Sequence, residues 1–155
     1  MFANIQFHLE YLKKLPISKR ITGEWTRDTA GGCANYRETT NKNPIHLIQV
    51  DRPTEFIVEL RAPKEYSGNF QNSVSWVRFS NSFSKQFSKQ MKVAIHVTDE
   101  SEKAVSDSGS YRPGYTLVRG TLQPGKYVFK VSTFYPEKIG KYFFDFSSSN
   151  SVTFL

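Results

Sequence analysis

The chain has 155 residues, of which 38% are hydrophobic and 15% aromatic, and it carries a net charge of +7. This length favours one domain, and the apolar runs are too short to span a bilayer, so we expect neither a membrane-spanning protein nor a precursor with a secretory leader. The single cysteine cannot form an internal disulfide, which favours a reducing, cytoplasmic compartment.

Alternation of apolar and polar residues with a period of two dominates the chain and predicts β-strands. Residues 4–11 show this alternation, and Pro16 then breaks the run. Further strands are predicted at residues 45–50, 55–60, 92–98, 115–122, 127–133, 141–146 and 152–155. Turn signals separate them at residues 51–53, 106–110, 112–114, 123–125 and 137–140.

About eight short strands punctuated by glycine and proline are typical of an all-β, antiparallel β-sandwich. No alternation of strands and helices is present that would predict a parallel sheet. The aromatic residues of the later strands are expected to lie in the core: Tyr127, Phe129, Phe143 and Phe144.

Residues 75–92 depart from this pattern. Wound as a helix, this stretch would gather phenylalanines on one side and basic residues on the other, as in helices that bind membrane surfaces. The other interpretation, which we favour, is an inserted surface loop or a strand extension whose phenylalanines cover the core. The candidate lipid-binding or partner-binding residues are Arg78, Phe79, Phe83, Lys85, Phe87, Lys89 and Lys92.

Cys33 is the first candidate for catalysis, but a cysteine nucleophile needs a histidine within hydrogen-bond reach. The three histidines, His8, His46 and His96, occupy alternating strand positions where we expect a solvated face or a sheet edge. We therefore expect Cys33 to be a structural, partly buried thiol.

Neither phosphate nor metal binding has a strong signal. The pair Gly31 and Gly32 does not form a Walker loop, and two adjacent glycines more often serve a sharp bend. No zinc spacing or EF-hand loop is present, so we expect no cofactor. Weak calcium candidates are the acidic residues Asp51, Asp99, Glu100, Glu102 and Asp107, although acidic loops are commonly only solvated.

The positive charge favours acidic partners, such as anionic lipid headgroups or an acidic protein surface. Nucleic acid is the least favoured partner, because no sequence signature of a nucleic-acid-binding fold is present. The residues alone therefore favour a binding or regulatory module.

Two separated motifs resemble the C2-like β-sandwich of calpains, known as domain III. The first, at residues 23–44, comprises a Gly-x-Trp strand, a Thr-Ala-Gly-Gly turn and an Asn-Pro pair: Gly23, Trp25, Thr29, Ala30, Gly31, Gly32, Asn43 and Pro44. The second, at residues 122–146, contains the Pro-Gly-x-Tyr strand of Pro124, Gly125 and Tyr127. Cys33 and residues 59–67 are most similar to the PalB or calpain-seven branch.

The resemblance implies that residues 21–155 form a calpain C2-like domain and that residues 1–20 are a linker or an extra edge strand. It implies a non-catalytic part of a cytoplasmic cysteine endopeptidase, the distal of two C2-like domains. Such a domain is expected to contact the protease core or its neighbouring domain, and to bind anionic phospholipid or membrane-trafficking proteins at the membrane periphery.

Two departures from the family pattern bear on regulation. Conventional calpains carry a long acidic loop after the strand that Asn-Pro opens, whereas this chain has only residues 50–55, with Asp51 and Glu55. The resemblance therefore implies weak or absent calcium control through that loop. The stretch at residues 69–91 is an apparent insertion.

Overall fold

The computed structural model describes residues 15–62 and 91–155, and its regular structure is almost entirely β. The predicted strands at residues 4–11 and most of the stretch at 75–92 lie outside these described residues. A short 3₁₀ helix, η1 (Thr40–Lys42), precedes the second strand. The strands are β1 (Ile17–Trp25), β2 (Ile45–Val50), β3 (Thr54–Arg61), β4 (Lys92–Asp99), β5 (Ala104–Asp107), β6 (Arg112–Pro113), β7 (Tyr115–Leu122), β8 (Gly125–Thr133), β9 (Gly140–Ser148) and β10 (Thr153–Phe154).

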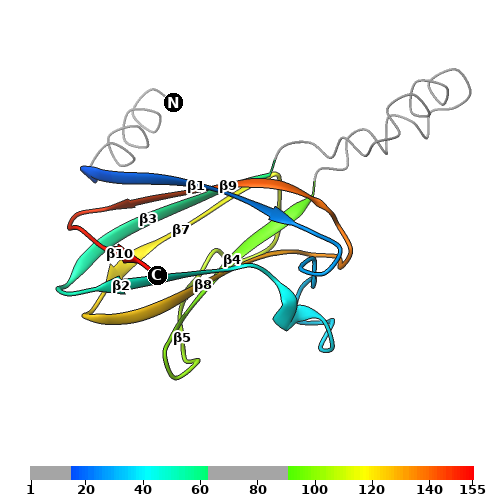
Figure 1. The fold of residues 1–155 in the computed structure, drawn as a ribbon, viewed down its shortest axis with the longest axis horizontal. Helices are drawn as coiled ribbons and strands as arrows, with labels where there is room; N and C mark the ends of the chain where they lie inside the picture. Colours follow the sequence, from blue (N-terminus) through cyan, green and yellow to red (C-terminus); the bar gives the residue numbers. More distant parts are fainter. Residues whose placement is uncertain (1–14, 63–90) are drawn as a thin grey trace, which may run out of the picture.

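The strands form two antiparallel sheets packed face to face, as expected for a sandwich (Figure 1). The first sheet has the order β1-β9-β3-β7, and the second has the order β10-β2-β8-β4-β5, with β6 paired to β4. Apart from β4 with β5 and β6, the paired strands come from distant parts of the chain, so the fold is held mainly by long-range pairing. The sequence-based expectation of an all-β antiparallel sandwich is confirmed.

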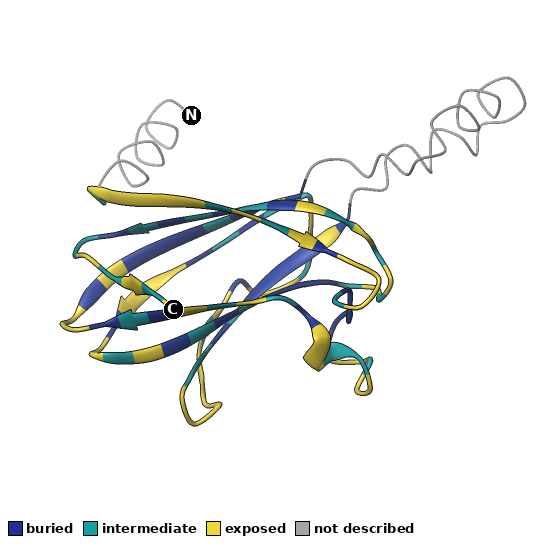
Figure 2. Ribbon diagram, in the orientation of Figure 1, coloured by how far each residue is buried: buried dark blue, intermediate teal, exposed yellow. Residues whose placement is uncertain are grey.

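Aromatic rings fill the space between the sheets, and buried positions alternate with more exposed ones along the inner strands (Figure 2). Phe129 of β8 is fully buried and meets Phe56, Phe144 and Phe146 edge to face, with ring centroids 5.5, 6.0 and 5.7 Å away. Such pairs each contribute about 0.5–1.5 kcal/mol beyond the area they bury. Ring geometry therefore adds to apolar burial in joining the two sheets.

The structure corrects one expected core position. Phe144 is fully buried, but Phe143 is only half-buried and lies on the outer face, where the Arg20 guanidinium sits 4.8 Å from its ring centroid. Successive side chains of a strand point to opposite faces, so Phe143 and Phe144 cannot share the core. Tyr127 and Phe129 are buried as expected.

The strands predicted at residues 45–50 and 115–122 have the same bounds in the structure. Three strands, the short β5 and β6 and the nine-residue edge strand β1, were not predicted from alternation. β5 and β6 lie where only turn residues were recognised, and β1 begins at Ile17, four residues before the boundary placed at residue 21. β1 was expected only near Gly23 and Trp25, from the resemblance.

The turns after β2 and β4 gather at one end of the second sheet, because Val50 pairs with Gly125 and Asp99 pairs with Tyr127.

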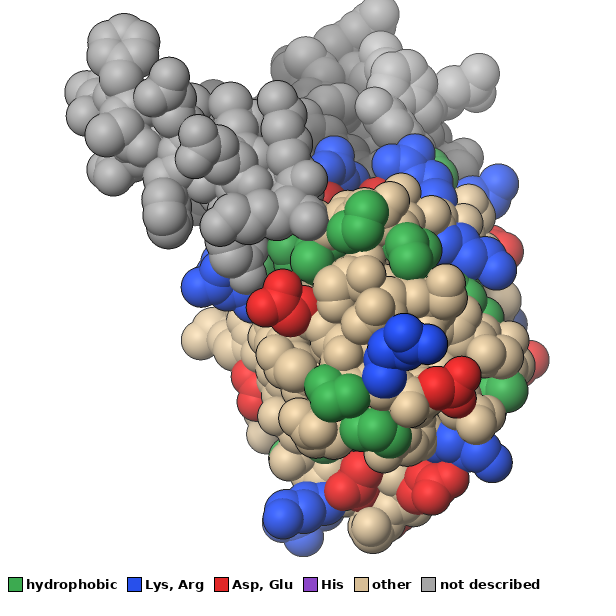
Figure 3. Space-filling model, turned by 90° about the vertical axis from the view of Figure 1, so that its left-hand side faces the viewer, with side chains coloured by type: hydrophobic (Ala, Val, Ile, Leu, Met, Phe, Trp, Pro, Cys, Tyr) green, Lys and Arg blue, Asp and Glu red, His purple; other side chains and the backbone are tan. Residues whose placement is uncertain are grey.

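A view onto one end of the sandwich shows basic and acidic side chains interspersed, rather than a surface of one charge (Figure 3). No helix in the part of the chain that the structure describes is both long and apolar enough to cross a bilayer.

Candidate functional site

The corner loop, residues 26–44, joins β1 to β2 at the end of the sandwich opposite the β2–β3 turn. It begins with a tight turn in which Thr29 Oγ1 accepts a hydrogen bond from the Thr26 N–H at 2.8 Å. The Ala30 N–H donates to the Thr26 carbonyl at 2.8 Å, and the Ala30 carbonyl accepts from the Glu137 N–H at 2.8 Å. The corner loop is therefore fixed both to itself and to the β8–β9 connection.

The glycine pair lets the corner loop fold back on itself. A Cβ atom at Gly31 would lie 2.0 Å from the Thr39 carbonyl oxygen, and Gly32 has a φ of +77° that favours glycine. The buried Asn43 side chain closes the bend: its Oδ1 accepts from the Gly31 N–H at 3.1 Å, and its Nδ2 donates to the carbonyls of Gly32 and Thr40, each at 2.8 Å. In this geometry the glycines shape a corner and present no phosphate loop.

Trp25 and Pro44 attach both ends of the corner loop to β8. The buried Trp25 indole N–H donates to the Val131 carbonyl at 3.2 Å, and the Val131 N–H donates to the Pro44 carbonyl at 3.1 Å. The Trp25 ring also packs on Tyr142 with centroids 4.6 Å apart. Gly23 makes room for Tyr142, since a Cβ there would lie 2.3 Å from the tyrosine hydroxyl.

The second motif forms the turn between β7 and β8 at the other end of the sandwich. Pro124 is exposed, and Gly125 has a φ of +152°. The Tyr127 hydroxyl donates back to the Gln123 carbonyl at 2.7 Å. Both motifs thus lie at connections between strands, where they fix the chain path.

Cys33 is buried within the corner loop, with 5% of its surface exposed. Its backbone N–H donates to the Phe134 carbonyl at 3.1 Å. Among the described residues, no hydrogen bond joins its thiol to a histidine; His46 and His96 bond to tyrosine hydroxyls instead. The burial of the thiol agrees with the sequence-based expectation.

His46 corrects the expectation of a solvated histidine. His46 lies on the same side of β2 as the buried Ile48 and Val50, so its ring faces the interior and stacks on Phe144 with ring centroids 4.3 Å apart. Its Nε2 lies 3.0 Å from the Tyr142 hydroxyl. Burial lowers the pKa of His46 to about 4 and raises the pKa of Tyr142 to about 12, so both are neutral at pH 7.

His96 lies on the outer face of β4 and is half-buried. Its Nε2 is 3.3 Å from the Tyr111 hydroxyl, which in turn lies 2.7 Å from Ser132 Oγ. Burial, and then the neighbouring Lys130 charge, lower the pKa of His96. This chain of polar groups ties β4, β8 and the segment before β6 together.

The acidic calcium candidates do not gather into a site in the described part of the chain. The Asp99 carboxylate accepts from the backbone N–H groups of Ser101 and Lys103 at 2.9 and 3.0 Å, and the Asp107 carboxylate accepts from that of Gly109 at 2.7 Å. Glu100 pairs with Lys126 at 3.9 Å. No group of three or more His, Cys, Asp or Glu side chains suited to a metal ion occurs among residues 15–62 and 91–155.

Asp51 and Glu102 also lie in turns of the sandwich. Asp51 lies in the three-residue connection between β2 and β3, at residues 51–53, and Glu102 adopts a φ of 64° in the β4–β5 turn. The basic and aromatic candidates at 78–89 lie outside the described residues. Lys92, the last of that group, is exposed at the start of β4.

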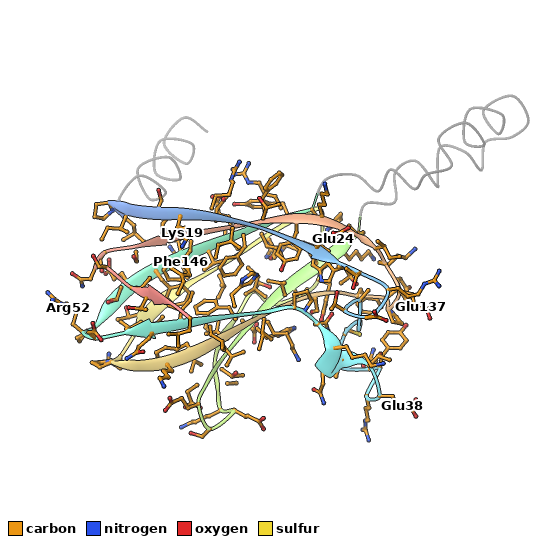
Figure 4. All side chains as sticks on the ribbon, viewed as in Figure 1. Lys19, Glu24, Glu38, Arg52, Glu137 and Phe146 are labelled. Atoms are coloured by element: carbon orange, nitrogen blue, oxygen red, sulfur yellow. The ribbon has the colours of Figure 1, made fainter. Side chains whose placement is uncertain are left out.

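Sequence reasoning gave no signal for surface grooves, and two of those in the described part of the chain lie beside β1 and the corner loop. The corner groove, about 510 Å³, lies beside the corner loop and is bordered by side chains of both charges, including Arg37, Glu38 and Glu137. The inter-sheet groove, about 320 Å³, opens between β1 and the C-terminal segment, where Figure 4 shows Lys19 and Phe146. Each groove is built from segments far apart in sequence, so strand periodicity carries no signal for either.

The outer face of the first sheet carries a polar network. Arg20 forms a two-pronged ion pair with Asp145, at 2.7 and 3.1 Å. On the neighbouring strands the Tyr115 hydroxyl donates to the Glu59 carboxylate at 2.5 Å. Burial and this hydrogen bond raise the pKa of Tyr115 to about 12, so the hydroxyl remains a donor at pH 7.

Comparison with known proteins accounts for the motif at the corner loop. The profile of the family described as calpain large subunit, domain III, matches residues 21–146. The chain belongs to the calpain domain III family. Calpain domain III is a non-catalytic region of calpain-type proteases, and the corner loop lies within the matched residues.

Curated relatives of this calpain domain III come from more than one kind of enzyme. Calpain-7 of Mus musculus is 31% identical over 137 residues, covering 86% of this chain and 14% of the relative. The calpain-like protease palB of Emericella nidulans is 32% identical over 124 residues, covering 79% of this chain and 13% of the relative. The serine/threonine-protein kinase 4 homolog B of Dictyostelium discoideum is 27% identical over 133 residues, covering 84% of this chain and 11% of the relative.

The chain therefore spans about one seventh of the length of its calpain relatives. Among solved structures, the pre-peptidase C-terminal domain of a collagenase from Bacillus anthracis covers 88% of this chain, and 90% of that domain is covered. The two share 14% sequence identity, and the TM-score is 0.48.

Proposed function

We propose that this domain III is a regulatory and binding module of a calpain-type cysteine protease. It packs on the protease core or on an adjacent C2-like domain of the same chain and recruits the enzyme to membrane-associated or protein partners. The family match over residues 21–146 carries this proposal. The chain has no proteolytic activity of its own in this proposal, since its only cysteine supports the corner loop.

The kinase relative favours a binding role over a role tied to proteolysis. A domain similar to this one over 84% of the chain occurs in a protein named as a serine/threonine kinase. A module shared by a protease and a kinase is best suited to a task that both enzymes need, such as localisation or partner selection. This argument supports recruitment as the common function.

Association with the protease core is tested by mixing the chain with the remaining part of the parent protease, expressed separately. We expect the two parts to co-elute in size-exclusion chromatography and to show activity that depends on their association. Separate elution of the two parts, together with peptidase activity that is the same with and without this domain, would contradict the proposal that the domain packs on the protease core.

Membrane recruitment is tested by sedimentation with phosphatidylserine vesicles. Each Lys or Arg close to an anionic surface contributes about 1 kcal/mol, so the basic residues at 78–92 would give a salt-sensitive attraction. We expect pelleting at low salt that is lost in a variant with Lys85→Glu and Lys89→Glu. A double variant with Arg52→Glu and Lys103→Glu, exposed changes in the β2–β3 and β4–β5 turns, serves as the charge-matched control.

The second candidate function is a protein-interaction domain without lipid binding. The inter-sheet groove favours this alternative, because its lining combines apolar side chains such as Phe146 with the cation of Lys19, and such a lining is suited to a peptide. Equal and negligible pelleting with and without phosphatidylserine, together with partner capture that survives high salt, would favour it over membrane recruitment.

A further inference from the structure

Among the strands that the structure describes, β1 is an edge strand of the first sheet. It pairs with β9 along its whole nine-residue length, and no described strand pairs with its other side. Every second residue of such an edge directs its N–H and C=O groups outward, where another extended chain can bind them. The edge is also accessible, since the first four residues of β1 are exposed.

The inter-sheet groove lies directly beside this edge. Its lining combines the inner side of β1 with β9 and the C-terminal segment: Ile17, Lys19, Phe146, Val152 and Phe154 provide its main side chains. The Phe154 ring packs edge to face on Phe146, with centroids 5.5 Å apart, and gives the groove an apolar floor. A side chain of an added strand that points inward from the β1 edge would therefore meet apolar surface.

Lys19 adds a specific charge to the groove. Its ammonium lies 4.5 Å from the centroid of the Phe154 ring, and no described carboxylate lies within ion-pair distance of it. The next residue, Arg20, points to the opposite face and is already paired with Asp145 at 2.7 Å. Of these two adjacent cations, Lys19 is the one available to a ligand.

We propose that the β1 edge and the inter-sheet groove bind an extended peptide segment whose inward side chains are apolar, acidic and apolar at alternate positions. Ile17, Lys19 and Ile21 share the inner side of β1, and side chains opposite one another in paired strands lie on the same face. An acidic residue opposite Lys19 thus has apolar neighbours opposite Ile17 and Ile21. This inference rests on the proposed binding role and names one partner chemistry for it.

A second copy of the chain fits this site poorly. An antiparallel pair of β1 strands centred on Ile21 would place Gly23 opposite Lys19, and a pair centred on Lys19 would oppose two lysines. Neither arrangement supplies the acidic residue, and like charges directly opposite one another are destabilising. The charge pattern therefore favours a different polypeptide as the occupant.

The test uses the whole 155-residue chain and two fluorescent, end-blocked peptides. One has the sequence Thr-Ile-Thr-Glu-Thr-Ile-Thr, and the other has lysine in place of the central glutamate. Fluorescence anisotropy is expected to show at least tenfold tighter binding of the acidic peptide. The preference should reverse in Lys19→Glu, while Lys103→Glu should leave it unchanged, and amide NMR shifts on binding should centre on β1 and β10.

Equal affinity for both peptides, absence of binding, or shifts centred on another surface would overturn the assignment. A concentration-dependent dimer in analytical ultracentrifugation that is abolished by Lys19→Glu would also overturn it, in favour of a second copy. These results leave the proposed function intact, because the vesicle and protease-core tests do not involve the β1 edge. Failure of those tests with retained peptide selectivity would instead reject the broader role alone.

Discussion

Thr116 offers a direct test of how the buried interior is organised. It lies on β7 with no exposed surface, on the same inward side as Val118 and Leu122. Its Oγ1 atom is buried and has no hydrogen-bond partner in the described part of the chain. The Thr116→Val substitution replaces this hydroxyl by a methyl group of similar size, and we expect it to stabilise the domain.

The size of the effect follows from the cost of an unmade hydrogen bond. A buried polar group without a partner costs about 1–3 kcal/mol, and small local relaxation offsets part of the gain when it is removed. We therefore expect the free energy of unfolding to rise by about 1.5 kcal/mol in Thr116→Val. For a domain of this size that corresponds to an increase in Tm of about 4 °C.

Urea unfolding followed by tryptophan fluorescence is a suitable assay, because Trp25 is fully buried. Thr121→Val is the matched control: it makes the same substitution on β7 at an exposed position, and we expect a change below about 0.5 kcal/mol. Thr116→Ser keeps the hydroxyl and deletes the methyl group, so it should destabilise by about 1 kcal/mol.

A loss of stability in Thr116→Val would refute the reasoning, because it would mean that the hydroxyl has a favourable partner such as a bound water. A gain of equal size in Thr121→Val would refute it as well, since the effect would then reflect the strand preference of valine rather than burial.

Three further predictions concern the corner loop and His46. Burial lowers the pKa of His46 to about 4, so below pH 6.5 the unfolded chain binds a proton at this residue more readily than the folded chain does. The free energy of unfolding should therefore fall by about 2 kcal/mol between pH 6.5 and pH 4. In His46→Gln the urea midpoint should depend less steeply on pH over this range. Asn43→Ala should lower the free energy of unfolding by about 3 kcal/mol, because three hydrogen bonds are lost. The control Asn41→Ala, at an exposed position, should leave it nearly unchanged. Equal urea midpoints for the two variants would contradict the role of Asn43 in closing the bend of the corner loop. Cys33 should react with a thiol reagent only when the chain unfolds, and rapid labelling of the native protein would contradict its burial.

Strand periodicity predicted the parts of the fold that have one buried face. β2 and β7 show this most clearly, because each alternates buried and more exposed positions over most of its length. β1 escaped prediction because its inner side carries Lys19 and Gly23, which interrupt the apolar pattern. Edge strands with few buried residues give a weak signal, and tertiary pairing decides their structure.

The candidate sites were harder to predict because they depend on tertiary neighbours. Polarity alone suggested a solvated His46, yet its ring lies against Phe144 from the other sheet. The acidic residues were visible in the sequence, but their carboxylates cap their own turns at Asp99 and Asp107. The inter-sheet groove requires the C-terminal segment to return beside β1, which no local pattern specifies.

The contact between Gly23 and Tyr142 has a consequence for β1 as a whole. A strand at the border of a sheet can slide along its neighbour, and a shift of two residues preserves which side chains face inward. Here such a shift would drive Ile21 or Trp25 into the space that the tyrosine ring occupies, since Gly23 is the only residue of β1 without a side chain. The missing side chain at Gly23 thus fixes the register of β1 on β9. A peptide that pairs with the edge of β1 therefore meets Ile17, Lys19 and Ile21 at fixed positions along the sheet.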